Sequence, residues 1–586
     1  MYLFHIFRSF LPLHNTIGFG AVDFVELLFA ACLVVLLFAG PVVVRFARPL
    51  LGRPGAIMLG LGAMPIVLRL ALLPRSPVPT PSGADDFSYL LLADTLSHFR
   101  FSNPTHPLYR FFETNFVLQQ PTYSSIFPLG QGIVLAFGHS VFGLYWAGVL
   151  VSIGVLCALC YWMLRGWTTE RWAVVGGLLA VIQLGPLNQW MNCYWGGAVS
   201  GIAGCLVFGA LPRLRSSKLP YRLFKDRRDE SRRGTQECAR HGGRNAVLLG
   251  AGLGLQLLSR PFEFVLLCVC VGCFLSVGVD WHSLRRIFAI GALSFLPAAG
   301  LTALQNRSVT GSWTTLPYML SRYQYGVPAT FTFQPNPEPH RELTPEQMLD
   351  YQAQAAIHGS GTETVSTYLE RLFYRLRYYG FFFLPPLYIA LALFFFSSRR
   401  WLVAYSVLAV LIFGLGTNFY PYFYPHYIAA LTCILLLISV MGLEKMSRWA
   451  STTILLLCGA QFLFWYSVHL IVPPDITGIF RYETGDYINR GDPEGRIAIN
   501  KELARAHGRQ LVVVRYSPAH GFHEWIHNDA SIDNARVVWA LDLGTAENRQ
   551  LVSYFRDRHV WLLTPDSHPP QLRPYKPDDD LFEEAP

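Results

Sequence analysis

The chain has 586 residues, of which 52% are hydrophobic and 15% are charged, and its formal net charge is +9. Soluble proteins carry about 25% charged residues, so this composition excludes an ordinary soluble protein and indicates a polytopic membrane protein. The positive charge does not indicate a nucleic-acid partner, because eleven Lys and Arg residues are concentrated between Arg213 and Arg244. Such a basic segment is typical of a cytoplasmic loop.

The apolar runs predict about 12 to 13 transmembrane helices, since a span needs roughly 20 mostly apolar residues. The N-terminal sequence shows no clear cleavage site, so its first apolar run is expected to remain as a helix. The predicted spans lie near residues 23–44, 55–73, 144–164, 172–187, 194–211, 246–259, 262–279, 287–303, 379–397, 401–416, 427–443 and 451–472. The short apolar segment 129–142 contains three glycines and a histidine, and we expect it to lie at the membrane surface or to be partly inserted.

Lys and Arg in the short connections assign the sides of the membrane. If these residues are cytoplasmic, the twelve spans alternate without contradiction and the basic loop 212–245 is cytoplasmic. The opposite face then carries five connections, two of them long, and the C-terminal region. The outer connections are 74–143, 188–193, 259–261, 304–378 and 417–426. The sequence therefore predicts a membrane domain over 1–473 and an extracytoplasmic domain over 474–586.

The first outer loop begins with the acidic pair Asp85 and Asp86 in SGADDFSYLLLAD. An acid before a helix caps free backbone N–H groups, so we expect one member of the pair to be an N-cap. The other member is then free to act as a general base or to hold a divalent cation. The segment that follows has apolar residues at helical spacing, which predicts an amphipathic helix on the membrane surface.

Further along this loop, Glu113 lies between aromatic clusters in YRFFETNF. Burial there would raise its pKa unless a metal or another cation is its partner; a solvated loop glutamate is the alternative. His106, in NPTHP, is either a loop histidine or a functional ligand, and Tyr123 is a candidate for binding substrate. In the second outer connection, NQWMNCYWGG, the aromatic residues including Trp195 are either an interfacial belt or a sugar-binding surface.

The third outer turn, LSRPFEF, places Arg260 and Glu263 between two apolar runs. Charges at that depth are paired or functional. Arg260 either pairs with Glu263 three residues later or binds a lipid-linked phosphate, for which a forked guanidinium is well suited.

The last two outer connections add further candidates for contact with substrate. Arg322 and Tyr323 lie in PYMLSRYQYG, and His426 follows a run of tyrosines in TNFYPYFYPHY, where an interfacial anchor is the alternative. Between them, LTPEQMLDYQAQAAIHG predicts a helix with a capping box at Thr344.

From about residue 475 the sequence becomes polar and alternates predicted strands and helices, which indicates a small α/β domain with a largely parallel sheet. A helix is predicted to begin at a Thr cap, Thr545. The segment HEWIH has the letters of a zinc-protease motif, but it follows a strand and a glycine, so we expect a loop for acceptor recognition or regulation, or a plain surface loop.

The segments GADDFSYLLLADTL and FFETNFVLQQPTYSSIFPLGQGIVLAFG, early in a polytopic chain, resemble the family 39 type of the GT-C superfamily of membrane glycosyltransferases. That type includes the protein O-mannosyltransferases and the lipid A aminoarabinose transferase. The resemblance covers roughly residues 55–303. It is greatest to an uncharacterised bacterial branch in which a segment like WMNCYWGGA follows the loop.

The resemblance implies inverting transfer of a hexosyl or pentosyl group from a polyprenyl-phosphate donor to a lipid, glycan or protein acceptor, at the outer face of the bacterial inner membrane. Asp85 matches the position of the family's catalytic base, with Asp86 in place of the usual Glu. Glu113 matches a second loop acid, but Thr114 and Asn115 replace the Lys-Pro that follows it.

The missing lysine leaves the phosphate without its usual cation, and the residues offer two replacements. Arg260 can supply the charge, or a divalent cation, Mg or Mn, can lie at Asp86 and Glu113. A transporter or flippase of lipid-linked sugars is the main alternative function. That alternative predicts two related halves with broken helices, whereas this chain shows no obvious internal repeat.

Overall fold

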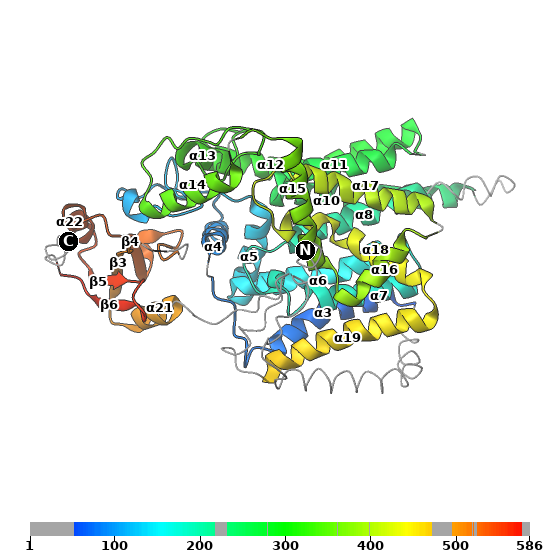
Figure 1. Ribbon diagram of the computed structural model, residues 1–586. Helices are drawn as coiled ribbons and strands as arrows, with labels where there is room; N and C mark the ends of the chain where they lie inside the picture. Colours follow the sequence, from blue (N-terminus) through cyan, green and yellow to red (C-terminus); the bar gives the residue numbers. More distant parts are fainter. Residues whose placement is uncertain are drawn as a thin grey trace.

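The computed structural model describes residues 52–81, 83–216, 231–277, 279–359, 361–397, 399–471, 495–518, 520 and 524–576. The predicted first span, the centre of the basic loop and the junction before residue 495 lie outside the described residues. Figure 1 shows a bundle of long helices on the right and a small α/β unit at the far left. The outer-loop helices α4, α13 and α14 lie between the two.

Every predicted span from residue 55 onward coincides with helical structure. The corresponding helices are α3 (Pro54–Ala71), α6 (Tyr145–Leu164), α7 (Glu170–Leu184), α8 (Ala198–Ser216), α10 (Ser231–Ser259), α11 (Pro261–Leu275), α12 (Trp281–Thr310), α16 (Tyr388–Phe394), α17 (Arg400–Thr417), α18 (Thr432–Lys445) and α19 (Arg448–Ile471). Among the described residues, seven helical segments are long and apolar enough to cross a membrane, or eight with one bent pair. The predicted total of 12 to 13 is reached only if shorter helices such as α7 and α11 also span.

The predicted span at residues 379–397 is wrong as a single straight helix, because the chain bends sharply there. Val365–Phe382 and Pro385–Phe394 meet at 110°. The bend falls at two adjacent prolines, which lack the backbone N–H that a continuing helix requires. The elements here are α15 (Val365–Arg375), η4 (Leu376–Phe382), η5 (Pro385–Leu387) and α16.

Close helix packing holds the short apolar helix α5 (Leu129–Phe142) against α6. A Cβ on Gly148 of α6 would collide with the carbonyl oxygen of Val134 on α5, so only glycine allows this approach. Small residues of this kind are how helices pack in membranes, where no hydrophobic driving force acts between them.

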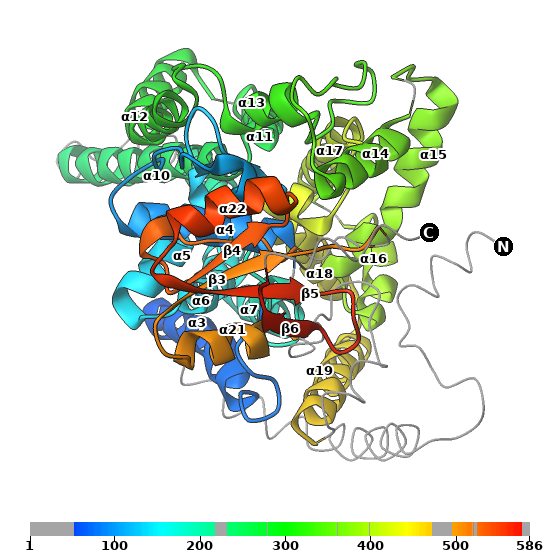
Figure 2. The ribbon, with the colours of Figure 1, turned by 90° about the vertical axis from the view of Figure 1, so that its left-hand side faces the viewer.

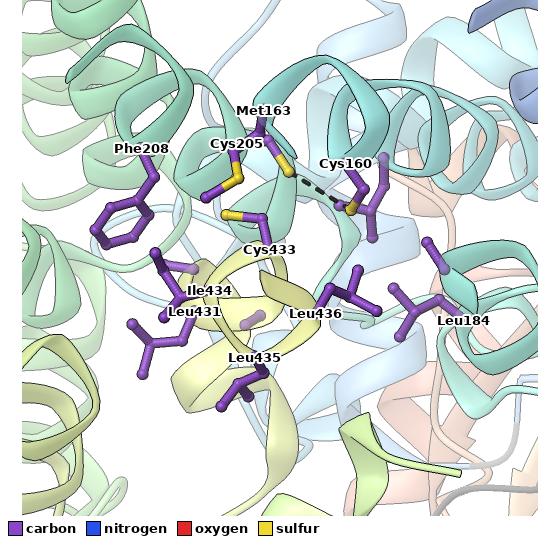
Figure 3. Packing of buried hydrophobic residues seen from close by; sticks show 14 of the residues in the cluster. Cys160, Met163, Leu184, Cys205, Phe208, Leu431, Cys433, Ile434, Leu435 and Leu436 are labelled. Atoms are coloured by element: carbon purple, nitrogen blue, oxygen red, sulfur yellow. Dashed lines mark hydrogen bonds between the residues drawn. The ribbon is translucent and has the colours of Figure 1, made fainter. Parts of the chain in front are cut away.

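Figure 3 shows the buried core where α6, α8 and α18 meet. Cys160 of α6 lies 3.7 Å from Cys205 of α8, sulfur to sulfur, and Cys433 of α18 lies beside them. Cys157, three residues before Cys160 in α6, is also buried. These thiols fill space among Leu, Ile and Phe side chains, as buried cysteines commonly do.

The long outer loops form short elements that pack on the bundle. They are α4 (Ala84–Ser97), η2 (Tyr109–Phe112), the antiparallel pair β1 (Val117–Leu118) and β2 (Ser124–Ser125), η3 (Gln189–Met191), α13 (Pro317–Tyr325), α14 (Pro345–His358) and η6 (Pro425–Leu431). The capping box predicted at Thr344 is confirmed: its hydroxyl accepts from Gln347 N–H at 3.2 Å, and the Gln347 side chain accepts from Thr344 N–H at 3.1 Å.

The C-terminal domain is a four-stranded sheet in the order β4-β3-β5-β6. Its elements are α21 (Arg496–Arg505), β3 (Arg509–Val514), η7 (Ile532–Asn534), β4 (Val537–Leu541), α22 (Thr545–Tyr554), β5 (Arg558–Thr564) and β6 (Gln571–Pro574). Strands β3, β4 and β5 are parallel, as predicted, and β6 adds an antiparallel edge. The predicted Thr545 cap is wrong, because the N-cap is Gly544 and no side chain caps α22. Figure 2 shows the sheet with α22 above and α21 below it.

This domain docks on α4, so the predicted surface position of α4 is wrong: most of the helix is buried. The ring of His527 stacks on Phe87, with centroids 3.8 Å apart. At the other end of α4, the Ala530 N–H donates to Asp94 at 2.7 Å. Glu524 and His527, of the HEWIH segment, lie in a loop that supports this contact, whereas His523 lies outside the described residues.

Candidate functional site

The acidic pair lies in the first turn of α4, and its two carboxylates have different surroundings. The N-cap of α4 is Gly83, and no side chain caps the helix, so the prediction that one of the aspartates is the cap is wrong. Asp86 is buried and accepts a hydrogen bond from the backbone N–H of Tyr194 at 2.9 Å. Asp86 therefore fixes the start of α4 to the second outer connection.

Asp85 is only half-buried and accepts no hydrogen bond from a distant segment of the described chain. Burial, reinforced by the charges of Asp86 and Asp350 and opposed by Arg260, raises the pKa of Asp85 from 3.8 to about 7. A carboxylate of this pKa is partly deprotonated at neutral pH and accepts a proton efficiently there, which is the requirement for a general base.

Arg260 lies at the N-cap of α11 and is within electrostatic range of Asp85. Its guanidinium carbon lies 4.5 Å from the centroid of the Tyr427 ring, and Nη1 lies 3.6 Å from Oε1 of Glu263. The hydroxyl of Tyr420 donates to the other oxygen of Glu263 at 3.4 Å. A distance of 3.6 Å is longer than a good hydrogen bond. Among the described residues, the contact with Glu263 therefore leaves guanidinium N–H donors available for an anionic ligand.

Aromatic side chains from two outer connections form a wall next to these charges. Trp195 packs edge-on against His426, with centroids 4.9 Å apart, and against Tyr424 at 5.8 Å. His426 in turn contacts Tyr427 at 4.7 Å. The structure thus brings together four of the residues that the sequence singled out: Asp85, Arg260, Trp195 and His426.

Glu113 has partners that all come from the second long outer loop. Its carboxylate accepts from the Tyr325 hydroxyl at 2.8 Å and from the Gln347 amide at 3.2 Å, and it pairs with Arg341 at 3.5 Å. Burial raises the pKa of Glu113, against the opposing effect of Arg341 and the two hydrogen bonds. Glu113 therefore joins two outer loops.

Two other predicted residues of the first loop contact the C-terminal domain. His106 Nε2 lies 3.1 Å from Asp533, and the Leu108 N–H donates to His106 Nδ1 at 2.9 Å. The Tyr123 hydroxyl donates to the Asn528 carbonyl at 3.0 Å. Both side chains thus hold the interface between the loop and the domain.

Of the residues predicted in the fourth outer connection, Arg322 has a local structural role. Its guanidinium donates to the carbonyls of Pro328 and Ala329 at 2.9 and 3.2 Å. Tyr323 is exposed and stacks on His340 with centroids 4.0 Å apart.

The residues proposed for a cation do not fit one in this structure. Asp86 receives a backbone N–H, and Glu113 is satisfied by an arginine, a tyrosine and a glutamine. Within the described ranges no group of three or more His, Cys, Asp or Glu side chains is placed to hold a metal ion.

Sequence reasoning missed several residues that surround Asp85 and Arg260. Asp350 of α14 raises the pKa of Asp85, the charge of Asp85 in turn raises the pKa of Tyr427, and Tyr420 holds Glu263. Tyr420 belongs to the aromatic run before His426 and Tyr427 directly follows that histidine, which was a visible signal. Nothing in the sequence around Asp350 distinguishes it from an ordinary acid on a surface helix.

No protein-family model matches the chain, and no curated protein matches it. Among solved structures, ArnT from Cupriavidus metallidurans in the apo state is similar at 12% identity and TM-score 0.47, covering 91% of this chain and 93% of that chain. ArnT bound to undecaprenyl phosphate gives 12% identity and TM-score 0.49, covering 87% and 93%. The Archaeoglobus fulgidus oligosaccharyltransferase in complex with Zn and sulfate gives 14% and 0.45, covering 87% and 67%. Similarities at this level assign no activity to this chain.

Proposed function

We propose that the protein is a membrane glycosyltransferase that moves a sugar from a polyprenyl-phosphate carrier to an acceptor hydroxyl at the extracytoplasmic face. The observation that carries the proposal is the pairing of a base and a cation: Asp85, whose pKa is about 7, lies in the field of Arg260. The sequence resemblance to the family 39 type of GT-C glycosyltransferase supports the same class.

Asp85 is the general base in this proposal. Its carboxylate takes the proton of the acceptor hydroxyl while the acceptor oxygen forms a bond to the anomeric carbon and the bond from that carbon to the carrier phosphate breaks. The configuration at the anomeric carbon inverts, because attack and departure occur on opposite faces of an oxocarbenium-like centre. The Asp85 carboxylate is suited to this step because no distant backbone donor among the described residues engages it, unlike that of Asp86.

Arg260 binds the carrier phosphate and stabilises the charge that develops on it as the bond breaks. A guanidinium presents N–H donors in a fork that matches phosphate oxygens. The ring of Tyr427 beneath it and Glu263 beside it hold the group in place. No step requires a metal ion, since Arg260 supplies the positive charge.

The aromatic wall of Trp195, Tyr424 and His426 provides flat apolar faces and polar edges for the transferred sugar. Asp85 lies in the first turn of the outer-loop helix α4 and Arg260 at the N-cap of the apolar helix α11; in this proposal the phosphate of the polyprenyl carrier lies at that level. This position explains an acidic base at the edge of an apolar domain.

The proposal is tested in cells that lack the gene, complemented with the wild type or with Asp85→Asn. Mass spectrometry of envelope glycans and of polyprenyl-linked sugars measures both acceptor and donor. The wild type restores the modified glycan, whereas Asp85→Asn is expressed equally, leaves the acceptor unmodified and accumulates the lipid-linked donor.

The matched control is Asp280→Asn, which makes the same chemical change at the exposed N-cap of α12, where Asn also caps well. That variant restores modification to the wild-type level. Full sugar transfer by Asp85→Asn would show that Asp85 is not the base, and an unchanged glycan profile in the deletion strain would reject the transferase itself.

A further inference from the structure

A cleft of about 570 Å³ opens between the outer loops and the C-terminal domain. One wall is formed by Tyr109, Arg110 and the segment 341–346. The other wall is formed by the carboxyl ends of β3 and β4, at residues 514–516 and 541–543. The carboxyl edge of a parallel sheet is where α/β domains commonly bind ligands, and the volume is typical of small-molecule sites.

The charges that line this cleft are almost completely paired. The pairs are Arg110 with Glu342 at 3.4 Å, Arg341 with Glu113 at 3.5 Å, and Arg515 with Asp542 at 2.5 Å. Three cations are thus neutralised by three acids, and the walls present N–H donors and carboxylate acceptors side by side. An anionic ligand such as a nucleotide or a phosphate headgroup finds no unpaired cation here among the lining residues.

Glu346 is the acid left over. Its Oε2 is buried and has no hydrogen-bond partner in the described part of the chain. A buried oxygen without a donor is unfavourable by about 1–3 kcal/mol, and a ligand hydroxyl or amine would satisfy it once the carboxylate turns into the cleft that Glu346 lines. Burial also raises the pKa of this carboxyl.

Two tyrosine rings add flat surfaces to the polar walls. Arg341 lies over one face of Tyr109 at 5.3 Å, and His520 stacks on one face of Tyr516 at 4.0 Å. Both rings also line the cleft. A net charge near zero, mixed donors and acceptors, and aromatic faces together match a pyranose, which has hydroxyls at its edge and C–H groups on its faces.

Helix α14 connects this cleft to the site around Asp85. Glu346 and Asp350 are four residues apart, so they lie on the same side of α14 and about 6 Å apart along its axis. Asp350 acts directly on the charge of Asp85. A sugar bound at Glu346 would therefore lie about one turn of α14 from the residue that acts on Asp85.

We infer that this cleft binds sugar residues of a glycan acceptor and presents the glycan to Asp85. This inference rests on the proposed function in one respect, which is that the bound glycan is the acceptor of the transferred sugar. Binding itself requires no transfer, so it can be measured separately from activity.

The test is binding of the full-length protein in nanodiscs to a printed array of neutral, amino and acidic glycans. The wild type and Asp85→Asn are expected to bind the same neutral or amino glycans. Glu346→Gln and Tyr109→Leu are expected to reduce that signal by about tenfold, because they remove the unpartnered acceptor and a ring face. Glu370→Gln, an exposed acid-to-amide change on α15, leaves it unchanged.

Absence of binding to any glycan, or binding that Glu346→Gln and Tyr109→Leu leave intact, overturns the inference. Preference for acidic glycans overturns it too, because the cleft offers no unpaired cation among its lining side chains. If the cellular experiment shows transfer that depends on Asp85 but the array shows no binding, the inference of a glycan-binding cleft is wrong and the proposed function stands. If the array shows the expected binding but the cellular experiment shows no transfer, the cleft binds glycans and the proposed function is wrong.

Discussion

Asp85→Asn is expected to stabilise the protein while abolishing transfer. The folded state raises the pKa of Asp85 from 3.8 to about 7, a shift of about 3 units, and each unit corresponds to 1.36 kcal/mol. Above pH 7 the ionised carboxylate therefore costs the fold about 4 kcal/mol, and less to the extent that solvent screens this half-buried group. An amide has no charge to desolvate and removes this cost.

The stability difference between Asp85→Asn and the wild type should depend on pH. Because the pKa of Asp85 is raised on folding, its contribution is most favourable below pH 4 and is lost as pH rises to about 7. The unfolding temperature of Asp85→Asn in detergent should exceed that of the wild type by several degrees at pH 8. The difference should shrink toward zero near pH 4.

Asp280→Asn serves as the control, since this exposed N-cap aspartate keeps its capping role as asparagine. Its unfolding temperature should follow the wild type across the pH range. An Asp85→Asn protein that is equally or less stable at pH 8, or whose advantage persists at pH 4, would refute the reasoning that Asp85 is held in an unfavourable ionised state.

Three further changes test the surroundings of the site. Asp350→Asn removes a charge that raises the pKa of Asp85, so the pH at which sugar transfer is half-maximal should fall below its wild-type value. The control Asp350→Glu keeps the charge and should keep the wild-type pH profile. An unshifted profile for Asp350→Asn would contradict this prediction. Arg341→Met leaves Glu113 buried without its cation and should destabilise the fold by roughly 3 kcal/mol. Adding Glu113→Gln to this variant should restore part of the lost stability. If thermal unfolding shows that the two losses simply add, the two residues are not coupled. Arg69→Met removes hydrogen bonds to Asn192 at 2.7 Å and to two backbone carbonyls at 2.9 and 3.0 Å and should lower stability by roughly 2–4 kcal/mol; unfolding at the wild-type temperature would show that this buried arginine is not a structural clamp.

Local sequence signals predicted the helices and the C-terminal sheet, because hydropathy and strand-helix alternation are properties of the nearby residues alone. The capping box at Thr344 was predictable for the same reason: its two hydrogen bonds join residues three apart. The aspartate cap on α4 was a reasonable local expectation that failed. Asp86 is engaged by Tyr194, 108 residues away, and no local pattern reports that contact.

The environment of α4 shows the same limit. Apolar residues at helical spacing predicted a helix with one face on the membrane, but the C-terminal domain covers α4 through His527 and Ala530. Apolar periodicity identifies a face that must be buried without identifying what buries it. The candidate site is similar: residue types suggested Asp85 and Arg260, whereas Asp350 joins them only because α14 folds back from a separate loop.

Three carboxylates on α4 have distinct tasks, and their hydrogen bonds explain why. Asp86 at the start of the helix accepts the Tyr194 N–H, and Asp94 near its end accepts the Ala530 N–H. One tie leads to the membrane bundle and the other to the C-terminal domain, so the helix is fixed at both ends. A general base must be held in place by a supporting shell while its own oxygens stay available. Asp85 directly precedes the tie at Asp86 and meets both conditions, and the C-terminal domain thereby contributes to the geometry of the proposed site through its contact with Asp94.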